Sequence, residues 1–156
     1  MFPPGAFDTE PGDGWRPVGR SELLTAALKG VHVLIVDDDR DSLEILRTIL
    51  RYFGALTTEA RSAAAALAVL GRVTPDVVVI DLVMPERSGL ALIRDIRARP
   101  AAAGLRAVAL TGHPDVNTRT AALAAGFDAY LRKPVDPAAL CRTLAALAAD
   151  RQPPTR

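Results

Sequence analysis

Short apolar runs rich in valine and isoleucine recur along the chain, and the stronger ones end at a polar residue. The runs cover residues 31–36, 55–59, 77–80, 107–110 and 128–131. Between the runs, apolar residues recur at the spacing of an amphipathic helix. Continuous apolar strands that alternate with helices are typical of a parallel sheet covered on both faces. The pattern therefore predicts an α/β domain in which a five-stranded parallel sheet is doubly wound by five helices.

The ends of the predicted helices carry capping residues. Glycines stand where three of the helices should end, and the last helix has an aspartate at its N-cap with a proline in its first turn. The predicted helices lie between 43 and 53, between Ser62 and Gly71, over 89–98, over 115–125 and from Asp136 onward.

The domain predicted from this pattern spans residues 31–149. The 156 residues, of which 49% are hydrophobic, fit one ordinary domain with short additions. Residues 1–30 are predicted to be a flexible N-terminal extension, because eight of the first twenty are proline or glycine, with a short helix near 22–29. Residues 150–156 are expected to form a C-terminal tail.

Charge and cysteine content exclude several classes of function. The formal net charge of +1 argues against a polybasic surface, so we expect no direct contact with nucleic acid. No apolar run approaches the roughly 18 residues of a membrane span, and the first residues do not resemble a signal peptide. The single cysteine, Cys141, cannot form an internal disulfide. These observations predict a cytoplasmic protein that does not contact membranes.

Polar residues follow the strongest predicted strands. They are Asp37 and Asp38 after the first strand, Asp81 after the third, Thr111 after the fourth and Lys133 near the end of the fifth. Ligands of doubly wound sheets bind outside the carboxyl ends of the strands. We therefore expect these five side chains to converge on one crevice.

The expected cluster suits a divalent cation and a phosphoryl group. Three crowded carboxylates repel one another unless a cation lies among them, and oxygen ligands favour Mg²⁺. The charges of three carboxylates, one Mg²⁺ and Lys133 cancel. Conversion of one aspartate to an acyl phosphate would add negative charge that the metal and the lysine oppose, while Thr111 could donate to a phosphoryl oxygen.

At the level of motifs, the sequence resembles the receiver domain of bacterial response regulators, over essentially all of residues 31–149. The resemblance lies in LIVDDD at 34–39, IDLVMPERSGLALIRDIR at 80–97, VALTG at 108–112 and AGFDAYLRKPVD at 125–136. It implies a flavodoxin-like fold, in which a strand-helix unit is repeated five times.

The resemblance also implies roles for the residues at the strand ends. Asp81 would be the phosphoacceptor, and Asp37 and Asp38 would bind Mg²⁺ or Mn²⁺ together with Asp81 and the backbone carbonyl of Val83. Thr111 would bind the phosphoryl group and Lys133 would pair with it, with a cis peptide bond before Pro134.

Three further residues are implied to tune signalling. Tyr130 occupies the position of an aromatic switch that moves with Thr111. Val83 and His113 occupy positions that tune loss of the phosphoryl group. Because Val83 cannot orient a water molecule by a hydrogen bond, we expect a longer phosphoryl lifetime than in fast chemotaxis-type receivers.

In such a system the donor would be a phosphohistidine on a histidine kinase or a histidine phosphotransfer protein. The chain would be a signalling phosphoacceptor rather than an enzyme, its own chemistry being self-phosphorylation from a donor and self-dephosphorylation. A protein partner, which the sequence does not identify, would read the state at the face formed by residues 115–149, and a phosphorylation-dependent homodimer through that face is a further expectation. The motif GFDAYLRKPVDPAAL also resembles receiver modules of hybrid histidine kinases.

The sequence suggests two other interpretations. A pseudo-receiver would keep the fold for protein interaction without phosphorylation, but every acidic, hydroxyl and lysine position is retained. A haloacid-dehalogenase-type phosphatase would use Asp37 and Asp39 as its nucleophile motif. That interpretation needs a second acidic pair after Lys133, where only Asp136 and Asp150 stand, isolated from each other.

Overall fold

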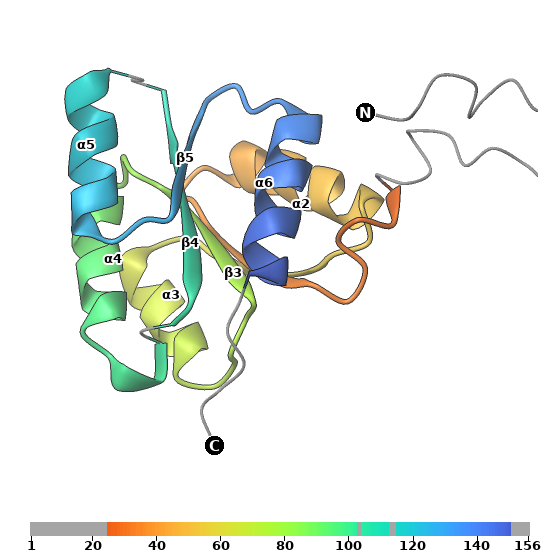
Figure 1. The fold of residues 1–156 in the computed structure, drawn as a ribbon. Coiled ribbons are helices and arrows are strands. Elements are labelled where there is room, and N and C mark those ends of the chain that lie inside the picture. Colours follow the sequence, from red (N-terminus) through yellow and green to blue (C-terminus); the bar gives the residue numbers. More distant parts are fainter. Residues whose placement is uncertain (1–24, 103, 113–114, 151–156) are drawn as a thin grey trace, which may run out of the picture.

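A five-stranded parallel sheet forms the centre of the molecule (Figure 1). The computed structural model describes residues 25–150 except 103, 113 and 114. The strands lie in the order β2-β1-β3-β4-β5, and every neighbouring pair is parallel. They are β1 (His32–Val36), β2 (Leu56–Ala60), β3 (Val77–Asp81), β4 (Arg106–Thr111) and β5 (Ala129–Arg132). The doubly wound α/β fold predicted from the sequence is confirmed.

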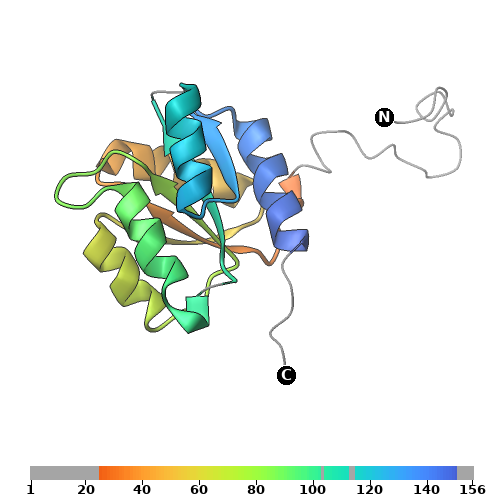
Figure 2. The ribbon, with the colours of Figure 1, turned by 60° about the vertical axis from the view of Figure 1, so that its left-hand side comes forward.

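Helices cover both faces of the sheet (Figures 1 and 2). Each begins after an Asp or Ser whose side chain accepts a hydrogen bond from a backbone N–H of the first turn. The helices are α2 (Arg40–Tyr52), α3 (Ala63–Leu70), α4 (Gly89–Arg97), α5 (Val116–Ala125) and α6 (Pro137–Ala149). A 3₁₀ turn at Pro100–Ala102, which the sequence pattern did not predict, follows α4.

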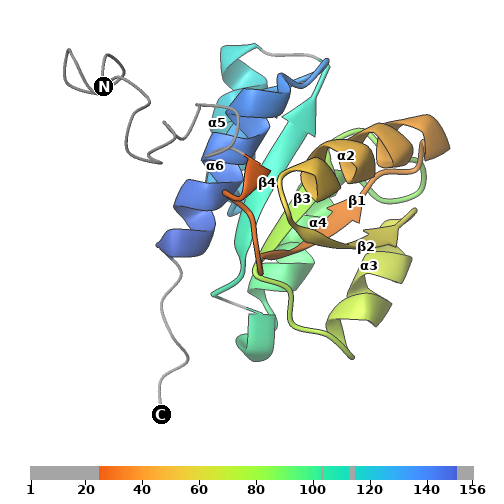
Figure 3. The same cartoon turned by 90° about the vertical axis from the view of Figure 1, so that its right-hand side faces the viewer.

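The buried side chains form one hydrophobic cluster on each face of the sheet. β3 is buried along its whole length, and its residues alternate between the clusters, with Val77 and Val79 in one and Val78 and Ile80 in the other. The cluster under α2 and α6 lies on the face opposite to that under α3, α4 and α5. Figure 1 shows these two sets of helices on either side of the sheet, and Figure 3 looks onto the face that α2 and α6 cover. Two covered faces explain why the strands read as continuous apolar runs rather than as alternating patterns.

The last residues of the predicted flexible extension pack against the domain. Leu28 is fully buried, and its backbone N–H donates to the carbonyl oxygen of Phe53 at 2.9 Å. Residues 26–30 form turns where the helix near 22–29 was predicted, and they end at Gly30 with φ of +79°. The beginning of that predicted helix, the rest of the extension and the residues after 150 lie outside the described residues. Because Leu28 is buried, residues 25–30 belong to the packed domain rather than to the extension.

In the described part of the chain, no helix is both long enough and apolar enough to cross a membrane.

Candidate functional site

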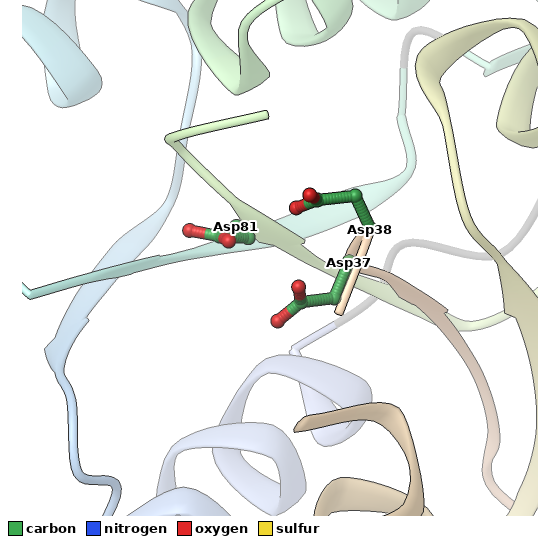
Figure 4. A group of neighbouring side chains, drawn as sticks. All are labelled: Asp37, Asp38 and Asp81. Carbon is green, nitrogen blue, oxygen red and sulfur yellow. The ribbon is translucent and has the colours of Figure 1, made fainter. Parts of the chain in front are cut away.

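Three aspartates meet at the carboxyl end of the sheet (Figure 4). Asp81 is the last residue of β3, and Asp37 and Asp38 directly follow β1, which lies beside β3. One carboxylate oxygen from each of the three lies within 4.8 Å of the others. The convergence arises because parallel neighbouring strands end at the same edge, as the sequence analysis predicted.

Lys133, which follows the outer strand β5, forms ion pairs with two of these carboxylates. Its Nζ lies 3.0 Å from Asp37 Oδ2 and 3.3 Å from Asp81 Oδ2. The lysine follows β5, and its backbone N–H donates to the carbonyl oxygen of Thr111 at 2.7 Å. The peptide bond between Lys133 and Pro134 is cis, as predicted.

Backbone N–H groups hold the second oxygens of the two buried aspartates. Asp37 Oδ1 accepts from the N–H of Asp39 at 2.9 Å, and Asp81 Oδ1 accepts from the N–H of Val83 at 3.2 Å. Asp37 is fully buried and Asp81 is 8% exposed. Their carboxylates are therefore fixed in position before any ligand arrives.

Burial and pairing act on the pKa values in this site. Burial raises the pKa of Asp81, and the N–H of Val83 and the charge of Lys133 only partly oppose it. Burial alone would lower the pKa of Lys133, but the hydrogen bond and charge of Asp37, together with Asp81, raise it above its ordinary value. Lys133 therefore remains a cation at neutral pH.

The other predicted site residues stand around this core. Thr111 ends β4, next to β3, and is 1% exposed. Tyr130 on β5 pairs in register with Ala109 and packs, half-buried, against the cluster under α3, α4 and α5. Val83 is 64% exposed in the loop after Asp81. His113 lies outside the described residues.

The acidic cluster fits a hard divalent cation. The three aspartates contribute three negative charges and only oxygen ligands, and Lys133 cancels one of those charges. The remaining two match a divalent ion, and Mg²⁺ binds through few carboxylates while it keeps water for a phosphate.

One contact at this site escaped the sequence analysis. Arg61, the residue after β2, donates from Nη2 to the backbone carbonyl oxygen of Asp38 at 3.3 Å. The signal was present, because β2 ends at the same edge of the sheet as β1. The run at 55–59 is less apolar than the others, so the sequence does not single out the residue that follows that strand.

Comparison with known proteins agrees with this geometry. Residues 33–145 match the response regulator receiver domain, and the chain belongs to this family. Receiver domains act as phosphoacceptors in two-component signalling rather than as enzymes on outside substrates, with a histidine kinase as the donor.

Similar proteins come from several bacteria. A 14.6 kDa uncharacterized protein of Leptolyngbya boryana is 44% identical over 115 residues, which are 74% of this chain and 88% of that protein. Response regulator MprA of Mycobacterium ulcerans is 38% identical over 104 residues, which are 67% of this chain and 44% of MprA. The chain thus spans less than half the length of that relative.

A solved receiver domain shows the same fold. The signal receiver domain of a signal transduction histidine kinase from Syntrophus aciditrophicus is 27% identical and superimposes with a TM-score of 0.73. The match covers 81% of this chain and 98% of that domain.

Proposed function

We propose that this protein takes a phosphoryl group from a phosphohistidine onto Asp81. The donor would be a histidine kinase or a histidine phosphotransfer protein. The observation that carries the proposal is the contact of Lys133 Nζ with both Asp37 and Asp81, beside a buried Thr111 at the end of the neighbouring strand. In this proposal the protein acts in the cytoplasm, where a kinase has access to ATP.

In this proposal Asp81 is the nucleophile. A carboxylate oxygen of Asp81 attacks phosphorus, the new P–O bond forms, and the P–N bond to the donor imidazole breaks. Lys133 then pairs with the phosphoryl oxygens, and the hydroxyl of Thr111 donates to one of them. Because Lys133 already contacts Asp81, little rearrangement is needed to oppose the new charge.

Asp37, Asp38, Asp81 and the backbone carbonyl of Val83 would hold Mg²⁺ or Mn²⁺. The bound ion would supply positive charge against the oxygens of the phosphoryl group. Asp37 is held by the N–H of Asp39 and by Lys133, so its carboxylate keeps its place.

The signal would pass through Thr111 and Tyr130. In the proposal, phosphorylation draws Thr111 toward Asp81 and vacates space into which Tyr130 turns. Both residues lie on paired strands, since Ala109 is opposite Tyr130 two residues before Thr111. The move would change the face of α5, β5 and α6, where a protein partner would read it.

The test is phosphorylation by a small donor. The protein is incubated with Mg²⁺ and acetyl phosphate, and intact mass is followed for the wild type, Asp81→Asn and Asp41→Asn. Asp41 is exposed in the first turn of α2 and serves as the matched control. We expect one phosphoryl group on the wild type and on Asp41→Asn, and none on Asp81→Asn. Equal labelling of all three, or of none, would overturn the proposal, and the latter would favour a pseudo-receiver.

A further inference from the structure

Arg61 enters the site from the edge opposite to Lys133. It follows β2, the outer strand beside β1, whereas Lys133 follows β5 at the other edge. Val36 and Ala60 are register partners, and the backbone N–H of Asp37 donates to the carbonyl oxygen of Ala60 at 3.1 Å. The chain therefore brings Arg61 directly beside the acidic pair.

The guanidinium of Arg61 is held by one hydrogen bond, which leaves most of its N–H donors available. Its Nη2 donates to the carbonyl oxygen of Asp38 at 3.3 Å, and the side chain is exposed. A guanidinium has five N–H donors. Within the described residues, this contact is the one hydrogen bond that Arg61 makes. Among the described residues, Arg61 forms no ion pair with a carboxylate, whereas Arg47 and Arg87 pair with Glu59 and Asp95.

The charge balance of the site shows why a further cation would matter, because phosphorylation leaves negative charge in excess. Lys133 is committed to Asp37 and Asp81, and with a divalent ion it cancels the three aspartates. A phosphoryl donor brings about two further negative charges, and the acyl phosphate keeps one of them in excess. A cation at the rim would attract the donor and oppose that excess.

We propose that Arg61 is a positioning residue that favours dianionic phosphoryl donors. The inference rests on the proposed function of Asp81. Arg61 holds the turn that carries Asp38 and supplies positive potential on the β2 side of the pocket. The chemical step is unchanged: Asp81 attacks phosphorus and, with acetyl phosphate, acetate leaves.

The experiment compares two donors at low and high salt. Acetyl phosphate is a dianion near neutral pH, whereas phosphoramidate carries less net negative charge because its nitrogen is protonated. Initial rates of phosphorylation are measured for the wild type, Arg61→Gln and Arg61→Lys. Arg72→Gln is the matched control, because Arg72 is exposed beyond the far end of α3.

We expect Arg61→Gln to slow phosphorylation by acetyl phosphate about fivefold at low salt, the size of one screened charge interaction across a solvated rim. The loss should be smaller with phosphoramidate and should vanish near about 1 M salt, where the Debye length is about 3 Å. Arg61→Lys should restore the rate, and Arg72→Gln should match the wild type.

Equal loss with both donors at every salt concentration would overturn the inference, because it would show that Arg61 only shapes the Asp38 turn. Equal rates for Arg61→Gln and the wild type would overturn it as well, while leaving Asp81 as the acceptor. Failure of the proposed function is distinct, because the wild type would then take up no phosphoryl group from either donor.

Discussion

Lys133 holds together two carboxylates that would otherwise repel each other. The ion pairs to Asp37 and Asp81 stabilise the folded site, and in the proposed mechanism they also prepare it for the charge of a phosphoryl group. At the scale of single residues, the near-neutral total of +1 conceals this local separation of charge.

Val83 is expected to set a slow loss of the phosphoryl group. Its side chain is 64% exposed beside the acceptor and has no hydrogen-bonding atom. A Val83→Asn substitution supplies an amide that can orient an attacking water. Because one hydrogen bond is worth about 1 kcal/mol, we expect hydrolysis to become about fivefold faster. Decay of the labelled intact mass after donor removal measures it. Decay of the wild type within seconds would contradict the expected long lifetime.

Cys141 is expected to be a protected thiol. It is fully buried in α6, and burial raises the pKa of its thiol. Because the thiolate is the reactive form, reaction with iodoacetamide should begin to rise at higher pH in the native protein than in urea. Near pH 8 we expect the native rate to be at least about tenfold lower than the unfolded rate. Equal rates in the two states would refute the protection.

At the scale of elements, the turn from β3 into α4 positions Asp81, the proposed acceptor. Gly89 begins α4, and its backbone N–H donates to the carbonyl oxygen of Leu82 at 3.0 Å. A Cβ at this position would lie 2.5 Å from the carbonyl oxygen of Asp81 and 2.8 Å from Leu82 Cα. The start of the helix therefore rests on the backbone that carries Asp81, the proposed phosphoacceptor.

A Gly89→Ala substitution should damage both stability and phosphorylation. The backbone atoms that the new methyl meets cannot turn aside as a side chain could, so we expect a loss of about 1–3 kcal/mol or more. Displacement of Asp81 should also slow uptake from acetyl phosphate. Gly104→Ala is the control, because a Cβ there meets nothing within 4 Å. Urea unfolding measures the loss of stability, and initial labelling rates measure the loss of phosphorylation. Equal stabilities and equal rates for Gly89→Ala and Gly104→Ala would show that the backbone at the end of β3 tolerates the added methyl.

A second contact between elements lies at the amino ends of β4 and β5, away from the aspartates of the candidate site. The guanidinium of Arg97 at the end of α4 donates to the backbone carbonyl oxygens of Leu105 and Gly126 and pairs with Asp128 at 3.0 Å. These contacts tie α4 to the start of β4 and to the turn after α5. The arrangement also explains Gly126, where a Cβ would lie 2.9 Å from Arg97 Cγ.

Arg97→Met should destabilise the protein, because it keeps the aliphatic stem but leaves two carbonyl oxygens without their donor. Partly buried groups left in this way cost about 2–3 kcal/mol. Arg47→Met is the matched control, since it removes a more exposed pair with Glu59 worth at most about 1 kcal/mol. Chemical unfolding of both variants gives the comparison, and a loss at Arg97 no larger than that at Arg47 would refute the bridging role.

The order of strands and helices was predictable because local patterns encode it. Valine-rich runs, Ser and Asp caps and terminal glycines each act within a few residues, and the strand ends placed Asp37, Asp81 and Lys133 together. Contacts between distant segments were not predictable in this way. Leu28 reads as part of a glycine-rich extension until Phe53 is seen to accept its N–H, and Arg61 reads as a solvated charge until Asp38 is placed beside it.

At the scale of the whole molecule, phosphorylation is expected to change assembly through the 115–149 face. Val116 and Leu123 on α5 are 79% and 44% exposed, respectively. A symmetric dimer buries each contact twice. If Leu123 lies in that interface, Leu123→Asp removes about 1.5 kcal/mol or more at each of two sites, which weakens the dimer roughly 100-fold.

Sedimentation velocity with and without acetyl phosphate tests this expectation. The wild type should shift toward a dimer on phosphorylation, and Leu123→Asp should stay monomeric although it takes up phosphoryl as before. Leu56→Asp is the matched control, because Leu56 is 64% exposed on β2 at the other edge of the sheet. A wild type that remains monomeric when fully labelled would rule out the homodimer. The same face would then serve a different protein, because the Thr111 and Tyr130 switch proposed above still ends there.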